Sequence, residues 1–370
     1  MNRIPTAFYD HLCDISSTSE LWAAKELCGK YGKLARFAFE HRAEYYVEVV
    51  DGREEHGLLM YDCNDRDVDT LEEIEAVPKK FVRKVWMNKL DAKEEKVSQK
   101  VIQRFPYAYY NFLFKSSSIN EAWVDLAYSL KRLGSVTITE ELDEASLHLF
   151  QKLLIGRKLL MLSITTDAYK GAAMEVPKAL LCQDQFLLLE IIKLRGRAPF
   201  RQILDFWAEN SDKLRGKGFL LRDGCYSDVT QLEEFFTRGS TAADLPTVQE
   251  ALEPCTEDEH RLIRMQHFDV LQPFDKPSCF FKYEEGEEGS KRRIYISFEC
   301  RQPVLTQVAP LALDDQGDSD SDDEDAEEPS DDETDEESEK ETTWPLLPSY
   351  YGEKNLTLMK DTTLLHVLFG

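Results

Sequence analysis

The fold class follows from four short apolar segments: Val136-Thr137-Ile138-Thr139, Leu160-Met161-Leu162-Ser163-Ile164, Leu187-Leu188-Leu189-Glu190-Ile191 and Phe219-Leu220-Leu221-Arg222. Their isoleucines and the last leucine, at 138, 164, 191 and 221, are separated by 26, 27 and 30 residues. Apolar residues at helical spacing fill the stretches between them. A strand followed by a helix at this period predicts an α/β solenoid of the leucine-rich type, in which each unit covers the apolar face of its neighbour.

The repeat lacks one part of the leucine-rich pattern. No Asn or Cys follows each strand at the position where that residue usually turns the chain. The agreement is therefore one of period and order, and a three-layer α/β domain with a parallel sheet would give the same local pattern.

The flanking regions also contain strand signals. Residues 45–50 and 57–62 surround Asp51-Gly52 and predict a hairpin. Residues 68–104 are charged and helical in pattern, whereas 105–114 are dense in aromatic residues and predict a buried strand. A second hairpin is expected from 279–283 and 293–298, with a charged loop between them, and the final residues 364–370 are a candidate strand beside it.

The charge of the chain is concentrated in one segment. The 370 residues carry a net charge of −25, and residues 314–341 alone contain 18 Asp and Glu against one Lys. Such a segment repels itself and offers no apolar surface, which predicts disorder. Because residues 342–370 return to apolar patterning, we expect the acidic segment to be an insertion after which the chain packs back on the fold.

The hydroxyl residues of the acidic segment indicate a modification site. Five of them have an acidic residue three positions later, the pattern favoured by kinases of the casein-kinase-two type: Ser319, Ser321, Ser330, Thr334 and Ser338. Phosphorylation would add further negative charge, able to engage a surface rich in Arg and Lys. A solvating loop without a dedicated partner explains the same composition.

The N-terminal residues predict a pair of amphipathic helices. Ile4-Pro5, Phe8 and Leu12 begin the first, and after the polar residues 16–19 a second apolar set runs from Leu21 to 35. Ser19 is the expected N-cap of the second helix. Two short helices cannot bury their apolar stripes alone, so they must pack on the rest of the chain or on a partner.

This layout resembles an F-box, and the match consists of Ile4-Pro5, Phe8, Leu12, Leu21, Leu27-Cys28 and residues 31–35. Ala7 stands where an acidic residue is usual, and Tyr31 stands where the closing Trp is usual. The resemblance extends to a divergent, lineage-expanded group that has a Gly near the end of the second helix, here Gly29 or Gly32, and degenerate strand–helix units.

The resemblance implies a substrate-recognition subunit of an SCF-type ubiquitin ligase. The helix pair would bind the small adaptor subunit of the ligase, and the repeat region would bind an unknown target protein. The residues it assigns to docking are Ile4, Pro5, Phe8, Leu12, Leu21, Leu27 and Tyr31. Together with the patterns above, it divides the chain into an F-box-like pair (1–42), a hairpin and linker or cap region (43–119), a repeat domain with a C-terminal hairpin (120–310), the disordered acidic insertion (314–341) and a C-terminal segment that packs back on the fold (342–370).

Motifs that carry catalysis are absent from the sequence. It contains no phosphate-binding glycine loop, nucleophile elbow or zinc-binding helix, and its eight cysteines form no CxxC pair. His260 and His267 could share a helix face but lack a third ligand nearby. Residues 215–218 (RGKG) fit a helix stop better than a phosphate loop. We therefore expect no enzyme activity, no cofactor and no metal.

The expected surroundings follow from the same composition. The basic clusters at 79–84 and 291–293 are too short, in an acidic chain, to predict nucleic-acid binding, and they could instead face the acidic segment. No apolar run is long enough to cross a bilayer and no signal peptide is seen, which favours the cytoplasm or the nucleus.

The runner-up is a stand-alone interaction scaffold without a ubiquitin link, in which the N-terminal helices only cap the solenoid. Exposure of Phe8, Leu12 and Leu27 as one patch favours docking, whereas their burial against residues 45–115 favours capping.

Overall fold

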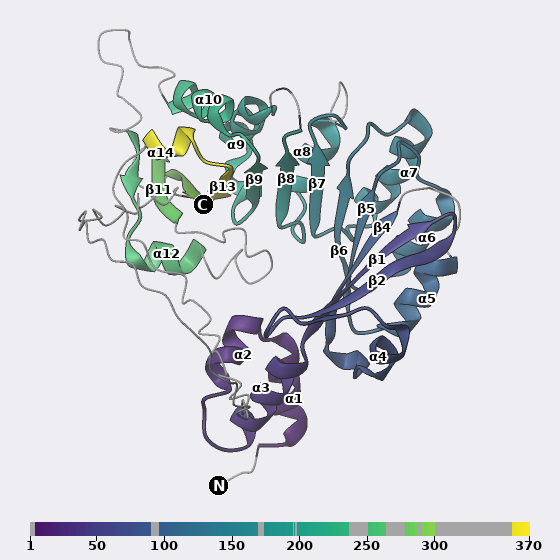
Figure 1. Ribbon diagram of the computed structural model, residues 1–370. Coiled ribbons are helices and arrows are strands. Elements are labelled where there is room, and N and C mark those ends of the chain that lie inside the picture. Colours follow the sequence, from purple (N-terminus) through teal and green to yellow (C-terminus); the bar gives the residue numbers. More distant parts are fainter. Residues whose placement is uncertain are drawn as a thin grey trace, which may run out of the picture.

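The computed structural model describes residues 4–89, 96–168, 174–194, 196, 198–236, 251–263, 278–286, 291–299 and 357–370. Within these residues the chain is a mixed α/β protein built on one sheet of thirteen strands, in the order β10-β11-β12-β13-β9-β8-β7-β6-β5-β4-β1-β2-β3 (Figure 1). The sheet includes strands from both sides of the boundary expected at residue 119.

The centre of the sheet is parallel, and its strands follow one another in chain order. It consists of β1 (Ala43–Val50), β4 (Val82–Lys89), β5 (Tyr109–Phe114), β6 (Leu133–Ile138), β7 (Met161–Thr165), β8 (Leu188–Ile192) and β9 (Gly218–Arg222). The four segments that the sequence singled out are the last four of these strands. Their prediction as successive strands is confirmed.

Helices connect the parallel strands and cover one face of the sheet. They are α5 (Lys96–Arg104), α6 (Glu121–Ser129), α7 (Glu144–Ile155), α8 (Glu175–Leu181) and α9 (Phe200–Leu214), followed by α10 (Tyr226–Phe236). Right-handed crossovers that always step in the same direction place these connecting helices on the same side of the sheet. The main core lies between them and the sheet, where Trp123 of α6 and Trp207 of α9 are fully buried.

The expected helix stop at residues 215–218 is confirmed. Helix α9 ends at Leu214, Gly216 adopts a φ of 77°, and β9 begins at Gly218. A positive φ suits glycine, which has no Cβ to clash with the preceding carbonyl.

Antiparallel strands close both ends of the sheet. On one side β1 continues into β2 (Arg53–Tyr61) through Asp51 and Gly52, which have φ values of 47° and 71°, and the two-residue β3 (Asp67–Val68) follows. This confirms the first hairpin. On the other side lie β10 (Glu253–Pro254), β11 (Ser278–Glu285) and β12 (Arg292–Glu299), and the β11–β12 pairing confirms the second hairpin.

The C-terminal strand joins the antiparallel end to the parallel centre. Strand β13 (Leu364–Phe369) pairs with β9 on one side and with β12 on the other, and all six of its residues are buried. Its expected place beside the second hairpin is confirmed. Helix α14 (Thr357–Lys360) precedes it. The acidic segment 314–341, with its five candidate phosphorylation residues, lies outside the described residues.

The expectation of helix throughout 68–104 is wrong at its centre. The region contains α4 (Leu71–Ala76), a turn of 3-10 helix (Lys79–Phe81), then β4 and α5. In β4 the residues Val82, Val85 and Met87 are buried while Lys84 is half-buried. The charged residues hid this alternation, and the neighbouring strands β1 and β5 decide it by supplying backbone partners on both sides.

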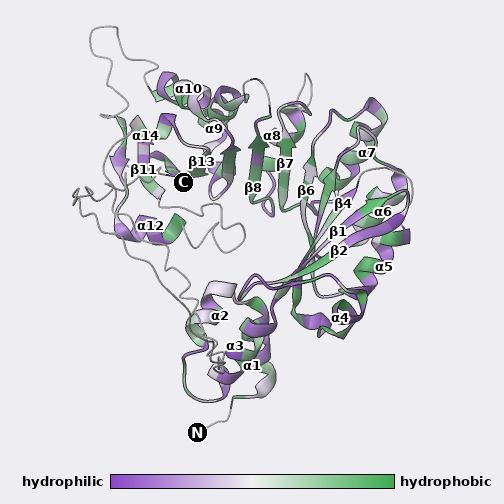
Figure 2. Ribbon diagram, in the orientation of Figure 1, coloured by the Kyte–Doolittle hydropathy of each residue, from purple (hydrophilic) through white to green (hydrophobic). Residues whose placement is uncertain are grey.

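A second, smaller core lies on the opposite face of the sheet. Helix α12 (Glu257–Ile263) brings Ile263 against Leu188, Leu220, Tyr295 and other apolar residues of the strands β8, β9, β11, β12 and β13. Figure 2 shows β7 and β8 largely in green, as expected for strands that are buried on both faces.

The N-terminal region contains three helices where the sequence predicted two: α1 (Thr6–Ile15), α2 (Thr18–Ala24) and α3 (Lys30–His41). The expected N-cap is wrong by two residues, because Ser17 caps α2 in a reciprocal pair with Glu20. The second helix ends early, and Gly29, with a φ of 91°, precedes α3. Figure 1 shows these helices grouped together at one end of the molecule, away from those that cover the sheet.

Candidate protein-interaction surface

The residues expected to dock on a partner differ in exposure. Ile4 is 50% exposed, Phe8 49% and Leu27 56%, whereas Leu21 is fully buried. Pro5 is exposed, and Leu12 and Tyr31 are half-buried. The set therefore divides into an outer group, which we call the apolar tip (Ile4, Pro5, Phe8 and Leu27), and residues that hold the helices together.

Contacts between α1 and α3 bring the members of the apolar tip to the same end. The ring of Tyr9 stacks on that of Tyr31 with centroids 5.8 Å apart. Lys30 donates a hydrogen bond to the hydroxyl of Thr6. The first turn of α1, which carries Phe8, therefore lies beside the turn that carries Leu27.

The inner face of the three helices forms its own small core. This core buries Leu21, Ala35, Ala38 and Phe39 together. The side chain of Phe81, just before β4, packs against them. This burial explains why Leu21 cannot be a docking residue in the folded chain. Ile4, Phe8 and Leu27 lie outside this core and remain about half exposed.

Polar contacts attach the helices to the ends of the strands. Thr18 donates to Asp62 at 2.9 Å, and the guanidinium of Arg83 lies 3.6 Å from the carboxylate of Asp14. The edge of the sheet on this side is formed by β3. The helices are thus held at residues 62 and 83 rather than along the edge strand.

Sequence reasoning missed two exposed apolar residues of the same helices. Ile15 is 65% exposed at the end of α1, and Phe37 is 46% exposed on α3, with its ring 5.4 Å from that of Phe81. Neither residue belongs to the expected docking set, and Phe37 lies beyond residue 35, the last residue of the expected second apolar set.

The aromatic and polar contacts between β1 and β4 were not predicted from the sequence. On the face opposite the helices, Tyr46 stacks on Trp86 with centroids 6.2 Å apart and an angle of 4° between the ring planes. Glu44 accepts hydrogen bonds from Lys84 at 2.7 Å, Trp86 at 2.8 Å and Tyr46 at 2.9 Å. Burial raises the pKa of Glu44, but the ammonium of Lys84 and the three donors outweigh it and hold that pKa below its usual value.

The described residues contain no candidate metal site. Among them no group of three His, Cys, Asp or Glu side chains could hold a metal ion. His260 lies over the ring of Phe280, and His267 falls outside the described part, so their pairing is untested. Six cysteines in this part are free thiols, and Cys279 is held in a disulfide.

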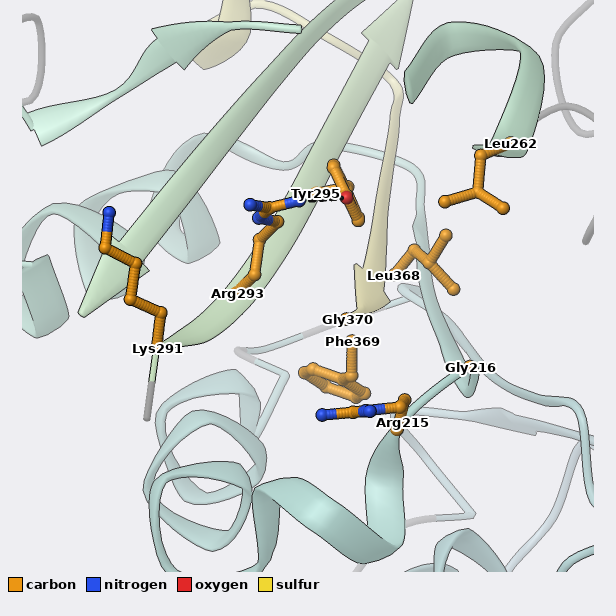
Figure 3. A pocket seen from close by; sticks show the side chains of 9 residues that line it. All are labelled: Arg215, Gly216, Leu262, Lys291, Arg293, Tyr295, Leu368, Phe369 and Gly370. Atoms are coloured by element: carbon orange, nitrogen blue, oxygen red, sulfur yellow. Dashed lines mark hydrogen bonds between the residues drawn. The ribbon is translucent and has the colours of Figure 1, made fainter. Parts of the chain in front are cut away.

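Two pockets open on the surface of the described part of the chain. One, of about 340 Å³, is lined by Arg215, Gly216, Leu262, Lys291, Arg293, Tyr295, Leu368, Phe369 and Gly370 (Figure 3). Its cations do not converge, because Lys291 and Arg215 lie on opposite sides and Glu284 and Glu259 pair with Lys291 and Arg293. The other, of about 500 Å³, is lined by Lys115, Thr139, Glu140, Glu141, Asp167 and Leu194 at the carboxyl ends of parallel strands.

Comparison with protein-family models, with curated proteins and with solved structures found no match for this chain. Among the described residues, none of the helices has the length and apolar character needed to cross a bilayer. The molecule is thus defined by its own features: a mixed α/β protein with a large, mostly parallel sheet and an N-terminal helical unit that exposes apolar side chains.

Proposed function

We propose that this chain is a non-enzymatic adaptor. Its N-terminal helices bind the small adaptor subunit of an SCF-type ubiquitin ligase through the apolar tip, and its strand–helix region, a degenerate solenoid of the leucine-rich type, binds a target protein. The observation that carries the proposal is the half-exposure of Ile4, Phe8 and Leu27 at one end of a unit whose inner face is already packed.

Exposed apolar groups of this kind favour association because burial removes them from water. Burying the remaining surface of one such side chain contributes about 1–2 kcal/mol, and a few central anchors carry most of the affinity of an interface. Polar contacts at Asp62 and Arg83 hold the helices on the sheet, so the apolar tip is presented from a fixed base.

The strand–helix array supports the second half of the proposal. Seven parallel strands follow in chain order, so each strand–helix unit lies beside its sequence neighbour, as in repeat proteins. Repeat proteins present extended surfaces on one face, and on the face opposite the connecting helices the second core with α12 lies over β8, β9, β11, β12 and β13.

Co-purification tests the proposal. The tagged 370-residue chain is expressed in cells of the organism from which the sequence comes. Proteins that co-purify with it are identified by mass spectrometry. We expect the adaptor subunit of the ligase to be retained by the wild type and lost in the double variant Phe8→Asp with Leu27→Asp. These two positions are chosen because each is half-exposed, so a charge there leaves the fold intact, unlike a charge at the buried Leu21.

A matched control uses an exposed apolar residue elsewhere. Ile155 at the end of α7 is 84% exposed, and Ile155→Asp should retain the adaptor subunit as the wild type does. If the wild type does not retain the subunit, or if the double variant retains it fully, the ligase assignment is wrong. The scaffold without a ubiquitin link then becomes the preferred description.

A further inference from the structure

A group of basic and aromatic side chains lies on the face of the sheet opposite the connecting helices, next to the N-terminal helices. We call it the basic–aromatic patch: Tyr46, Arg83, Lys84, Trp86, Tyr109 and Arg132. Its strands β1, β4 and β5 are neighbours, with Tyr46 level with Trp86 and Lys84 level with Tyr109. The residues that alternate with them, such as Val85 and Tyr110, point into the main core.

Printed contacts join the members of the patch into one surface. The guanidinium of Arg132 lies 5.6 Å from the centre of the Tyr109 ring and also donates to the carbonyl of Tyr107. Tyr107 and Tyr109 are 51% and 41% exposed. The stack of Tyr46 on Trp86 extends the aromatic surface by one strand.

The patch holds more positive charge than its neighbours neutralise. Lys84 is paired with Glu44, and Arg83 is paired with Asp14. No carboxylate of the described residues is paired with Arg132. Arg83 precedes Lys84, the residue level with Tyr109, and Arg132 lies over the Tyr109 ring. Burial lowers the pKa of Arg83, the carboxylate of Asp14 opposes that shift, and repulsion from the charge of Arg132 adds to it. An anion between them would relieve that repulsion.

We propose that the basic–aromatic patch binds an extended acidic peptide segment of a partner protein. A carboxylate of the segment would lie between Arg83 and Arg132, where two guanidinium groups supply charge-assisted hydrogen bonds. Its neighbouring side chains would pack on Tyr109 and Trp86. Three neighbouring strands span about 10 Å, the length of three or four extended residues.

Nucleic acid also binds basic and aromatic surfaces, but the charges here favour a peptide. Asp14 and Glu44 lie inside the patch, so a ligand with a single well-placed acidic group fits better than a polyanion. The inference that this patch recognises the target protein rests on the proposed function. The inference that it binds an acidic peptide does not.

A peptide library tests the inference. Three pools of immobilised nonapeptides carry Glu, Gln or Lys at the centre and random residues elsewhere, and the full-length chain is applied to each. We expect retention on the Glu pool to exceed that on the Gln pool by about tenfold, which corresponds to ~1.4 kcal/mol. Retention on the Lys pool should be lowest.

Two variants connect the binding to the patch. Arg132→Glu should abolish the preference for the Glu pool, and Tyr109→Ala should weaken retention on all pools, while thermal unfolding shows that both remain folded. Arg215→Glu is the matched control, because this exposed arginine lies in the separate pocket of Figure 3. It should bind as the wild type does.

Three results would overturn the inference. They are equal retention on the Glu and Gln pools, an unchanged preference in Arg132→Glu, and tighter binding of a single-stranded DNA 12-mer that depends on Arg132. In a further arm, residues 314–341 are replaced by a neutral linker. Peptide binding that is seen only after this replacement would show that the patch binds the chain's own acidic segment and not a partner protein. The ligase proposal fails separately, in the co-purification with the Phe8 and Leu27 variants.

Discussion

Gly32 of α3 gives the most informative single substitution in the N-terminal helices. A methyl group built on this glycine would lie 1.7 Å from the carbonyl oxygen of Leu27 and 2.7 Å from its carbonyl carbon. Both atoms belong to the backbone, so no side-chain rotation can remove the overlap. The turn that carries Leu27 would have to move by more than an ångström to accommodate Gly32→Ala.

The expected change in stability has the opposite sign to that of an ordinary helix position. Replacing a glycine inside a helix by alanine usually stabilises by about 0.5–1 kcal/mol. Forcing an extra methyl into a packed contact costs about 1–3 kcal/mol. Gly32→Ala should therefore destabilise the protein by ~1–2 kcal/mol, and it should weaken binding at the apolar tip because Leu27 is displaced.

Urea unfolding and hydrogen exchange measure the two effects. Gly32→Ala should lower the free energy of unfolding and speed amide exchange at residues 25–31. Lys33→Ala is the control, since this neighbouring residue is exposed and gains only the helix propensity of alanine. If Gly32→Ala has the same free energy of unfolding as Lys33→Ala, and amide exchange at residues 25–31 is unchanged, the backbone at Gly32 does not approach Leu27 as closely as described.

Three further predictions concern packing and charge. Asp228→Asn should cost about 3–5 kcal/mol by urea unfolding, because it leaves the buried ammonium of Lys193, now 2.7 Å from the carboxylate, without its counter-charge. Leu21→Ala should cost about 2–5 kcal/mol in the same assay, since that side chain is fully buried. Burial raises the pKa of Glu54, but Arg104 outweighs it and lowers that pKa, so stability should decline as the pH falls below about 4.5. Arg104→Gln should flatten this decline.

Each of these predictions has a control and a contrary result. Lys152→Met removes an exposed ion pair with Asp125 and should leave stability unchanged, so an equal loss in Asp228→Asn and Lys152→Met would contradict the role of burial. Phe8→Ala, at a half-exposed position, should cost far less than Leu21→Ala. If Arg104→Gln keeps the full decline in stability with acid, the ion pair with Glu54 does not set it.

Local pattern was sufficient for most strands of the sheet. The segments around Ile138, Ile164 and Ile191 are buried on both faces, and such runs are rich in apolar residues and therefore easy to recognise in a sequence. The first hairpin could also be predicted from the sequence, because Asp51-Gly52 favours the turn that joins two antiparallel strands. Strand β4 was missed because Lys84 and other charges alternate with its buried residues.

Long-range arrangement was outside the reach of pattern. The strand at 364–369 was expected near the second hairpin, but its insertion between β9 and β12 joins segments more than a hundred residues apart. The cap at Ser17 follows the local spacing of Ser17 and Glu20, which the choice of Ser19 overlooked. The helix break at Gly29 depends on how α2 and α3 pack on each other and on Phe81. No spacing rule in the sequence contains that contact.

The sequence by itself determined the strand–helix alternation, the two hairpins and the apolar character of the N-terminal helices, because these features depend on residues close together in the chain. Only the tertiary structure decided which members of the apolar stripe face outward: Phe8 and Leu27 lie exposed, while Leu21 fills the inner core. It also created the basic–aromatic patch, whose residues run from Tyr46 to Arg132 and meet only because parallel strands lie side by side. A surface of this kind is a property of packing.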